Sequence, residues 1–479
     1  MKLRMRIIAA ALMTALCLSG CVPQASLPET PAVLPTFDPS VVPPAPENCD
    51  QAAYQEQAVL WYPNESGSRL IYEEYTVSGE NRAQLCSLLL QAMLHKGAGR
   101  FPGSAQLNGV EYMGGGLAVA EWTIDPKADE KAIYALLVCC ANTLGSLGVE
   151  AVSFQINGRA ARLQGWPLGA LMPADSDINS LWAKLTLEGE QDECQRNALI
   201  FRAAADGSYI VPQLIQVHLQ RDREMDSLLE ALRSQPHLPG MNAAFPEDQR
   251  ALLNAPVWAG EGMVNLHFDA NVLAMLEAEG ILPWQMYAAT ACTCLAFLGQ
   301  VEGVRIYVSN AQVVRMEKDL SFEDGVMRWS DFVSVRAQTA SVYLSNGLGS
   351  LTAQTRFFID GKACDPHTLL DMVMAGPAEW EKDVLGVAPD PLPEGWLLGV
   401  TLEGREARVN LSGRFQAACS QMSPAREREV VYAMVNTLCQ LRGVDMVRFY
   451  VEGEAREVFV SEISFLSPLR ENQVMVAPQ

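Results

Sequence analysis

The sequence predicts an α+β protein built from three tandem two-layer modules, each with the order β-β-α-β-β-α-β. Three observations carry this prediction. Strand-like and helix-like patterns alternate in the same order three times. Similar alternating strands, each followed by a turn, recur at 152–156, 304–308 and 447–451. The chain also begins with a signal-peptide pattern and a proline-rich stretch, so the first module is expected to start near residue 55.

The first 20 residues have the layout of a secretory signal peptide. Three basic residues lie within the first six positions, and an apolar run follows at 7–18. This run is too short to cross a hydrocarbon layer of roughly 30 Å, which argues against a transmembrane helix. The segment ends Leu18-Ser19-Gly20-Cys21, which resembles the lipobox of bacterial lipoproteins. The resemblance implies lipidation of Cys21 and attachment to the extracytoplasmic face of the cell membrane.

Residues 21–54 are expected to form an extended, proline-rich stalk between the lipid and the first module. Its prolines are Pro23, Pro28, Pro31, Pro35, Pro39, Pro43, Pro44 and Pro46. The whole chain has 479 residues, of which 49% are hydrophobic, and a formal net charge of −21. Such a charge disfavours nucleic acid and anionic lipid as partners, so attachment to the membrane is expected to depend on the lipid.

The three modules are predicted at 55–170, 181–316 and 335–473, and we call them the first, second and third modules. Linkers are expected at 171–180 and 317–334. Each module opens with paired strands, and two helices are separated by another strand pattern. Asp365-Pro366 and Ser423-Pro424 are predicted N-cap and first-turn pairs of the two helices of the third module.

The ten cysteines after Cys21 are expected to be mostly small buried hydrophobes. Cys139 and Cys140 are adjacent, while Cys292 and Cys294 are two apart inside an apolar helical pattern. Neither spacing favours a disulfide within the pair, although disulfides remain an alternative in an exported protein. No CxxC or HxxxH pattern occurs, and the five histidines are scattered, so no metal site is predicted.

Longer stretches resemble the GerMN domain of sporulation and spore germination proteins of the GerM type. The resemblance is carried by "LIFRAAADGSYIVPQLIQV" in the second module and "VYAMVNTLCQLRGVDMVRFYVEG" in the third. The first module keeps "ANTLGSLGVEAVSFQING", whereas the second replaces the Asn-Thr pair with Thr293-Cys294. The resemblance implies a non-catalytic, membrane-tethered envelope module akin to the ring-building modules of secretion and sporulation complexes.

No pattern for catalysis or cofactor binding is present, so we predict neither an enzyme nor a cofactor. GxSxG, Walker and HExxH motifs are absent. The three glycines at 114–116 are interpreted as a turn rather than a phosphate cradle. Asp175, Asp177 and Asn179 match the first ligands of an EF-hand, but Ser180 and Thr186 occupy the positions of its glycine and its closing glutamate. A solvated linker is therefore preferred over a weak calcium site.

Six aromatic residues could line a ligand groove, although strand and helix periodicity favours a place in the core or on a partner face. They are Tyr62, Trp122, Trp284, Tyr287, Tyr307 and Tyr450.

The leading functional hypothesis is an envelope scaffold or assembly factor related to sporulation or germination, with envelope or sporulation proteins as partners. The alternative is a lipid-anchored sensory or ligand-binding module for a membrane receptor or transporter, and a cell-wall hydrolase is a third hypothesis.

The helix surfaces predict how the modules are covered. The second helix of the second module carries small, uncharged residues, and we expect it to pack against a neighbouring module or a partner. The corresponding helix of the third module begins with four charged residues, so its N-terminal end is expected to face water. The two sets are Ala288, Thr290, Thr293 and Ala296, and Arg426, Glu427, Arg428 and Glu429.

Overall fold

A computed structural model describes residues 42–47, 54–79, 81–238, 240–246, 257–258, 262–359, 365–441 and 443–477. Residues Pro44–Gln479 form one unit, separate from Met1–Pro43. The predicted signal peptide, Cys21 and most of the proline-rich stretch lie outside the described residues. Within the described ranges, no helix is long and apolar enough to span a membrane.

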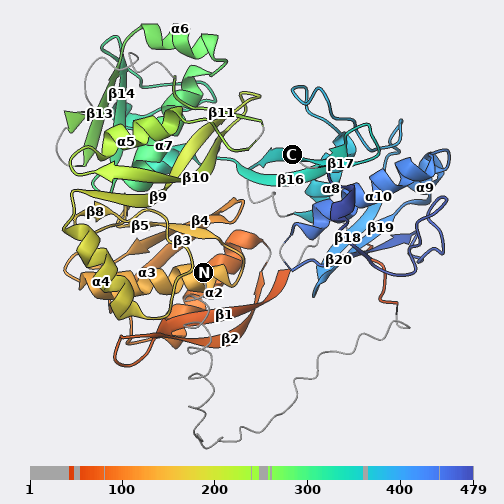
Figure 1. Ribbon diagram of the computed structural model, residues 1–479, viewed down its shortest axis with the longest axis horizontal. Helices are drawn as coiled ribbons and strands as arrows, with labels where there is room; N and C mark the ends of the chain where they lie inside the picture. Colours follow the sequence, from red (N-terminus) through yellow and green to blue (C-terminus); the bar gives the residue numbers. More distant parts are fainter. Residues whose placement is uncertain are drawn as a thin grey trace, which may run out of the picture. The chain divides into compact units, whose positions relative to one another are not determined.

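The first module follows the predicted order closely (Figure 1). Short strands β6, β7 and β8 follow its last main strand. Its elements are β1 (Tyr54–Pro63), β2 (Leu70–Gly79), α2 (Arg82–Lys96), β3 (Gln106–Gly114), β4 (Leu117–Thr123), α3 (Glu130–Gly145), β5 (Ala151–Ile156), β6 (Arg159–Ala160), β7 (Arg162–Leu163) and β8 (Trp166–Pro167).

The second module has the same order with additions. A short strand and an extra helix, α6, enter the pattern, and two 3-10 helices follow it. Its elements are β9 (Glu193–Ala204), β10 (Ile210–Gln220), α5 (Glu224–Arg233), β11 (Met241–Asn242), β12 (Val257–Trp258), β13 (Met263–Phe268), α6 (Asn271–Ala278), α7 (Pro283–Phe297), β14 (Gly303–Val308), β15 (Ala311–Gln312), η2 (Glu323–Gly325) and η3 (Trp329–Phe332).

The third module adds one short helix, α9, before its long second helix. Asp365 and Ser423 cap α8 and α10 by accepting bonds from Thr368 N and Arg426 N, which confirms the two predicted helix starts. The elements are β16 (Gln338–Ser345), β17 (Leu351–Phe358), α8 (Pro366–Ala375), β18 (Leu397–Glu403), β19 (Glu406–Leu411), α9 (Gly413–Cys419), α10 (Pro424–Cys439), β20 (Met446–Val451), β21 (Leu469–Arg470) and η5 (Gln473–Met475).

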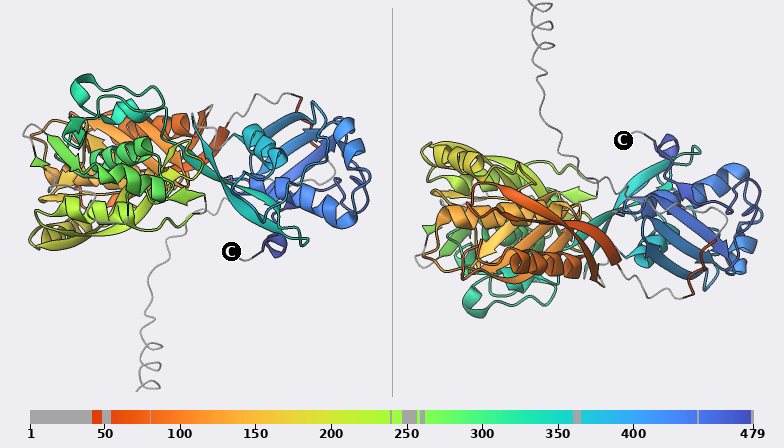
Figure 2. Two further views of the ribbon diagram at one scale, coloured as in Figure 1. Left: turned by 90° about the horizontal axis from the view of Figure 1, so that it is seen from above. Right: turned by 90° about the horizontal axis from the view of Figure 1, so that it is seen from below.

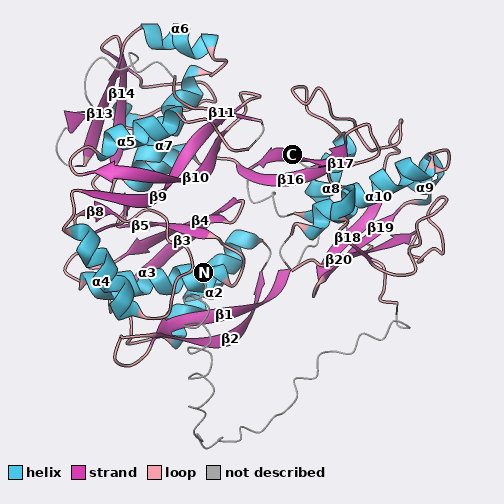
Figure 3. Cartoon of the chain, in the orientation of Figure 1, coloured by secondary structure: helices cyan, strands magenta, loops and turns pink. Residues whose placement is uncertain are grey.

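The α+β class is confirmed, and each module has a hairpin, a helical layer and a sheet rather than two layers (Figure 3). The first hairpin, β1–β2, is not hydrogen-bonded to the sheet β3-β4-β5-β6. The helices α2 and α3 contact strands of both. The sheets of the other two modules, β12-β13-β14-β15 and β18-β19-β20-β21, repeat the same antiparallel, parallel, antiparallel pairing. The long helices α3, α7 and α10 make the crossover that a parallel pair requires.

One threonine ties each of these helices to the first strand of its module. In all three cases the threonine hydroxyl oxygen accepts a hydrogen bond from a backbone N–H of the strand. The bonds run from Trp61 to Thr143 at 2.9 Å, from Phe201 to Thr293 at 3.0 Å and from Tyr343 to Thr437 at 3.0 Å. The three positions are therefore structurally equivalent.

This equivalence corrects the sequence register of the second module. Because Thr293 corresponds to Thr143 and Thr437, the residue that replaces the asparagine is Cys292, and the threonine is retained. The asparagines Asn142 and Asn436 each exchange two hydrogen bonds with the backbone of a residue beyond the last main strand, Ala174 and Asn472 respectively. A cysteine cannot make this paired contact.

The sheet of the first module is buried on both faces. Ala118, Ala120 and Trp122 of β4 point into the core of the first module, whereas Leu117 and Val119 belong to the core of the second module. A strand that is covered on both sides reads as a continuous apolar run, which β4 shows between 117 and 120.

Helix α7 lies against this second face, as the helix surfaces predicted. Ala288, Thr290 and Thr293 are completely buried and Ala296 is 4% exposed. The carbonyl of Ala296 accepts a bond from Ser153 Oγ of the first module at 3.4 Å. The expectation that this helix packs against a neighbouring module is confirmed at Ala296, which contacts the first module, whereas Thr293 is bonded to β9 of its own module.

The corresponding expectation for α10 holds only in part. Arg428 is exposed and Arg426 is half-buried, whereas Glu427 is completely buried and Glu429 is 6% exposed. The loop after β20 returns over this end of the helix and supplies hydrogen-bond donors to Glu427.

Neither predicted linker is an unstructured connection. The first overlaps α4 (Ile178–Gly189), which crosses the border predicted at residue 181. The second, 317–334, contributes Phe322, Met327 and Phe332 to the core of the second module. The apolar residues in these stretches are spaced irregularly, so no periodic pattern marked them as part of a core.

Candidate functional site

The strand that enters the third module is bonded to both of the other modules. In the second module, Ile210 N donates a hydrogen bond to Val335 O, and Ile210 O accepts one from Ala337 N, each at 2.9 Å. Two residues after Ala337, Thr339 pairs in parallel with Gly114 of the first module. Residues of all three modules therefore meet at 335–339, a segment that we call the junction segment.

Arg336 is the charged centre of the junction segment. It is 4% exposed, and its guanidinium donates two hydrogen bonds to Glu111 of β3, at 3.0 and 2.8 Å. The same group lies over the ring of Trp329, 4.0 Å from its centroid. A two-pronged arginine–carboxylate contact is strongly directional, so it fixes the position of the strand as well as neutralising the charge.

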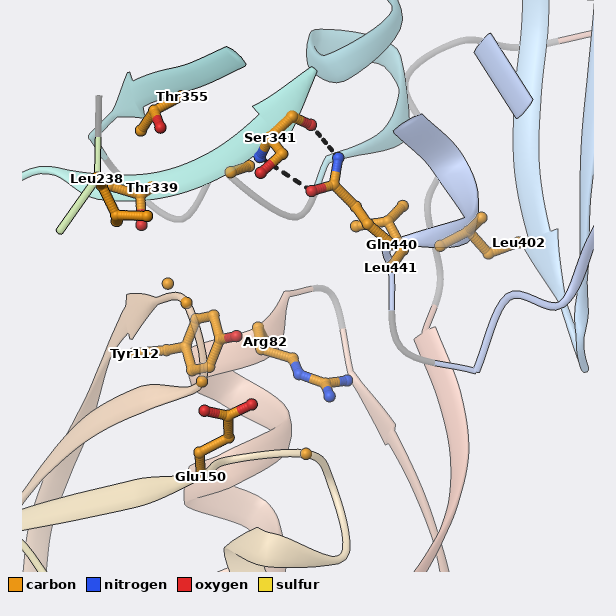
Figure 4. A pocket seen from close by; sticks show the side chains of 15 residues that line it. Arg82, Tyr112, Glu150, Leu238, Thr339, Ser341, Thr355, Leu402, Gln440 and Leu441 are labelled. Carbon is orange, nitrogen blue, oxygen red and sulfur yellow. Dashed lines mark hydrogen bonds between the residues drawn. The ribbon is translucent and has the colours of Figure 1, made fainter. Parts of the chain in front are cut away.

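A cavity of about 450 Å³ lies beside the junction segment (Figure 4). One wall is formed by the β3–β4 turn, where all three glycines at 114–116 have positive φ. This confirms the turn interpretation of the triple glycine. A Cβ atom at Gly114 would lie 2.7 Å from both the N and the O of Thr339, so glycine is needed where the two strands meet.

The polar groups around the cavity are largely engaged with one another. Gln440 accepts a bond from Ser341 N at 2.9 Å and donates back to Ser341 O, as the dashed lines in Figure 4 mark. The Arg82 guanidinium, 6% exposed, bonds to the Glu56 carboxylate and to Leu147 O. The lining of this cavity contains hydroxyl groups and one carboxylate, Glu150, but no histidine or cysteine.

Glu427 forms a second polar centre, inside the third module. Its carboxylate accepts bonds from the backbone N–H groups of Val460, Ser461, Glu462 and Ile463 and from the Ser461 hydroxyl. Burial alone raises the pKa of Glu427, but the hydrogen bonds from 460–462 outweigh burial and lower that pKa overall. The carboxylate therefore stays ionised and anchors the loop.

The eight described cysteines are free, and seven of them are buried, which confirms for this part of the chain that most are small buried hydrophobes. Burial raises the pKa of Cys292 and Cys294 to about 12, so both remain thiols. Among the described residues, no cluster of three or more His, Cys, Asp or Glu side chains has the arrangement of a metal site.

The EF-hand-like residues serve the helix that follows them. Asp177 caps α4 by accepting bonds from Asn179 N and Ser180 N. The Asn179 side chain accepts a bond from Lys131 Nζ at 2.6 Å. Cap and ion-dipole contacts thus occupy Asp177 and Asn179, two of the three residues that suggested calcium.

Three of the six aromatic candidates lie in the cores, and none of the six lines the cavity. The three are Trp122, Trp284 and Tyr287, while Tyr450 is buried outside the core cluster of its module. Tyr62 and Tyr307 are half-buried, and Tyr307 stacks on His267 with ring centroids 4.6 Å apart and planes at 7°.

Sequence reasoning missed Arg336, Glu111 and Glu427 as structural centres. Arg336 and Glu111 are 225 positions apart, and neither lies in a recognisable motif. In the sequence, only the position of Arg336 beside an apolar strand pattern could have indicated a buried ion pair, because a buried arginine needs a partner.

Comparison with known proteins identifies the type of the third module. The family model described as Germane, sporulation and spore germination, matches residues 341–457. No protein of curated function matches the chain.

Three solved structures are similar to this chain. The tandem GerMN domains of the sporulation protein GerM from Bacillus subtilis are 14% identical, over 58% of this chain and 98% of that chain, with a TM-score of 0.25. The first GerMN domain of the same protein is 17% identical, over 28% and 98%, with a TM-score of 0.24. A protein from Clostridium perfringens is 16% identical, over 29% and 89%, with a TM-score of 0.21. The match over 341–457 identifies a Germane domain, of the type described as sporulation and spore germination, in the third module.

Proposed function

We propose that this chain is a non-catalytic scaffold or assembly factor of the cell envelope, held on the extracytoplasmic face of the membrane by a lipid on Cys21. The observation that carries the proposal is the junction segment, where Arg336 and Gly114 join the three modules through buried, mutually satisfied contacts. Such contacts hold interaction surfaces in fixed positions and supply no reactive group.

The type of the third module supports the same role. A Germane domain relates the chain to sporulation and germination, and the hydrogen bonds that its buried charged centre, Glu427, accepts order a loop. Partners are envelope or sporulation proteins, with the membrane reached through the lipid and no role for nucleic acid.

Site-specific photo-crosslinking in the native host during spore formation tests the proposal. A photoreactive amino acid at Leu348, which is 87% exposed on the third module, or at Tyr72, 66% exposed on the first, is expected to trap a defined envelope protein. The buried position Leu344 serves as the matched negative control. Absence of adducts at both exposed positions, together with normal envelopes and spores in a deletion strain, would contradict a scaffold.

The cavity favours one alternative, a lipid-anchored sensory or ligand-binding protein for a membrane receptor or transporter. Its volume of about 450 Å³ is in the range of small-molecule sites. Native mass spectrometry of the protein extracted from its own envelope would show a co-purified molecule. A ligand lost on Ser341→Trp and retained on Ser350→Trp would replace the scaffold proposal with this one.

A further inference from the structure

The sheets of the three modules present equivalent faces, which the strand registers align. The pair His267–Tyr307 of β13 and β14 corresponds to Asn410–Tyr450 of β19 and β20, because both pairs lie four residues into identically paired parallel strands. Asn265–Arg305 corresponds to Arg408–Arg448 in the same way. We call this side of each sheet, turned away from the helices of its own module, the outer face.

The outer face of the first module is covered by a helix at Val119 and Ser153. These two residues stand at the positions of Asn265 and Arg305, while Glu121 and Gln155 stand at those of His267 and Tyr307. Val119 lies in the core of the second module, and Ser153 donates to Ala296 O of α7. A helix can approach the face at this point because both side chains are short.

The outer face of the third module carries large polar side chains and is covered by extended chain. Asn410 Nδ2 donates to the carbonyl of Pro46 at 3.1 Å, and Pro46 is buried. Asn410 and the adjacent Tyr450 are 4% and 1% exposed. The covering segment is Pro-Ala-Pro at 44–46, in which two of three residues lack a backbone N–H, so carbonyl oxygens are its main hydrogen-bonding groups.

The outer face of the second module has the same chemistry and is only half covered. His267 and Tyr307 form a flat, stacked pair, both half-buried, and Arg305 beside them is half-buried as well. The Oδ1 atom of Asn265 is buried, and no described residue donates to it. A buried amide oxygen without a donor is costly and indicates a missing partner group.

We propose that the outer face of the second module binds an extended, proline-containing segment of another protein. The imidazole N–H of His267 takes the role of Asn410 and donates to a carbonyl of the segment. A backbone N–H next to a proline satisfies Asn265 Oδ1, and the proline ring packs on the planar His267–Tyr307 pair. The chain's own Pro44–Pro46 is held on the third module and is therefore not the occupant.

Fluorescence anisotropy tests this proposal on the chain from residue 22 to 479. The probe is a labelled synthetic peptide with the sequence of residues 41–47, Val-Val-Pro-Pro-Ala-Pro-Glu. Saturable binding is expected, with affinity reduced at least tenfold by Tyr307→Ala and by His267→Ala. Tyr307→Phe, which keeps the ring, should stay within threefold of the parent, and Tyr72→Ala on the first module should not change binding. Unchanged circular dichroism melting separates lost binding from lost folding.

Three results would overturn the proposal. Binding that survives Tyr307→Ala but is lost on Asn410→Ala would mean that the peptide exchanges into the third module. Absence of saturable binding would mean that the face is not a peptide site. Sedimentation that shows self-association abolished by Tyr307→Ala would assign the occupant to a second copy. The proposal deepens the scaffold function and rests on it, yet its failure would leave the crosslinks at Leu348 and Tyr72 unaffected.

Discussion

Two threonines one turn apart on α7 provide a sharp test of which contacts hold this helix to the first strand of its module. Thr293 Oγ1 accepts the bond from Phe201 N of β9 at 3.0 Å, whereas Thr290 Oγ1 is buried without a partner in the described structure. Both residues are completely buried. Replacing each with valine keeps the shape and removes only the hydroxyl, so the two variants differ in one hydrogen bond.

The expected effects have opposite signs. Thr293→Val leaves the Phe201 N–H buried without an acceptor, which costs about 1–3 kcal/mol of unfolding free energy. Thr290→Val removes a hydroxyl that is dehydrated and unpaired, so it should be neutral or stabilise by up to about 2 kcal/mol. The same loss is expected for Thr143→Val and Thr437→Val, because these threonines hold the first strands of the other modules.

Hydrogen exchange resolved to single residues measures the effect where it arises. Exchange at the Phe201 amide should be at least about fivefold faster in Thr293→Val, since 1 kcal/mol corresponds to about that factor. Exchange in Thr290→Val should equal or fall below that of the parent. Equal acceleration of hydrogen exchange in both variants would refute the reasoning. The loss of stability would then come from replacing threonine with valine and not from the lost hydrogen bond.

Three further outcomes follow from the polar centres. Glu427→Gln can accept at only one oxygen, so exchange of the amides at 460–463 should be at least tenfold faster, while exposed Glu462→Gln in the same loop should change it less than threefold. Because the folded pKa of Glu427 is lowered, its stabilisation is complete above the ordinary carboxyl pKa and is lost as the pH falls through the lowered value, which acid titration of loop exchange would reveal. Gly114→Ala should expose the junction segment to protease, whereas Gly109→Ala on the same strand, with open space at its Cβ, should not. Arg336→Met leaves a partly buried carboxylate unpaired and should cost about 3 kcal/mol in thermal or urea unfolding, and an unchanged midpoint would contradict the role of the ion pair.

The sequence predicted what depends on short-range periodicity. The strand at 447–451 and the helix from Ser423 were identified because alternation, a cap and a first-turn proline act within a few residues. The charged run at 426–429 gave a wrong prediction for Glu427, because the burial of this residue depends on a contact that is distant in the sequence. Whether Glu427 faces water depends on a loop more than 30 residues away, whose backbone amides leave no mark on the sequence.

The register of the second module shows why contacts are needed to align diverged repeats. An alignment based on the sequence places Thr293-Cys294 at the position of Asn-Thr in the other modules. The bond from Phe201 N places Thr293 with the other two threonines, and Cys292 then replaces the asparagine. In the other modules, that asparagine is hydrogen-bonded to the backbone of the chain beyond the last main strand. The second module lacks the asparagine and therefore lacks this side-chain contact. The guanidinium of Arg336 lies close enough to Cys292 to oppose the rise of its pKa. The change from asparagine to Cys292 thus coincides with a different path of the chain after the last main strand of the second module. In this module the chain continues to Arg336 and the junction of the three modules.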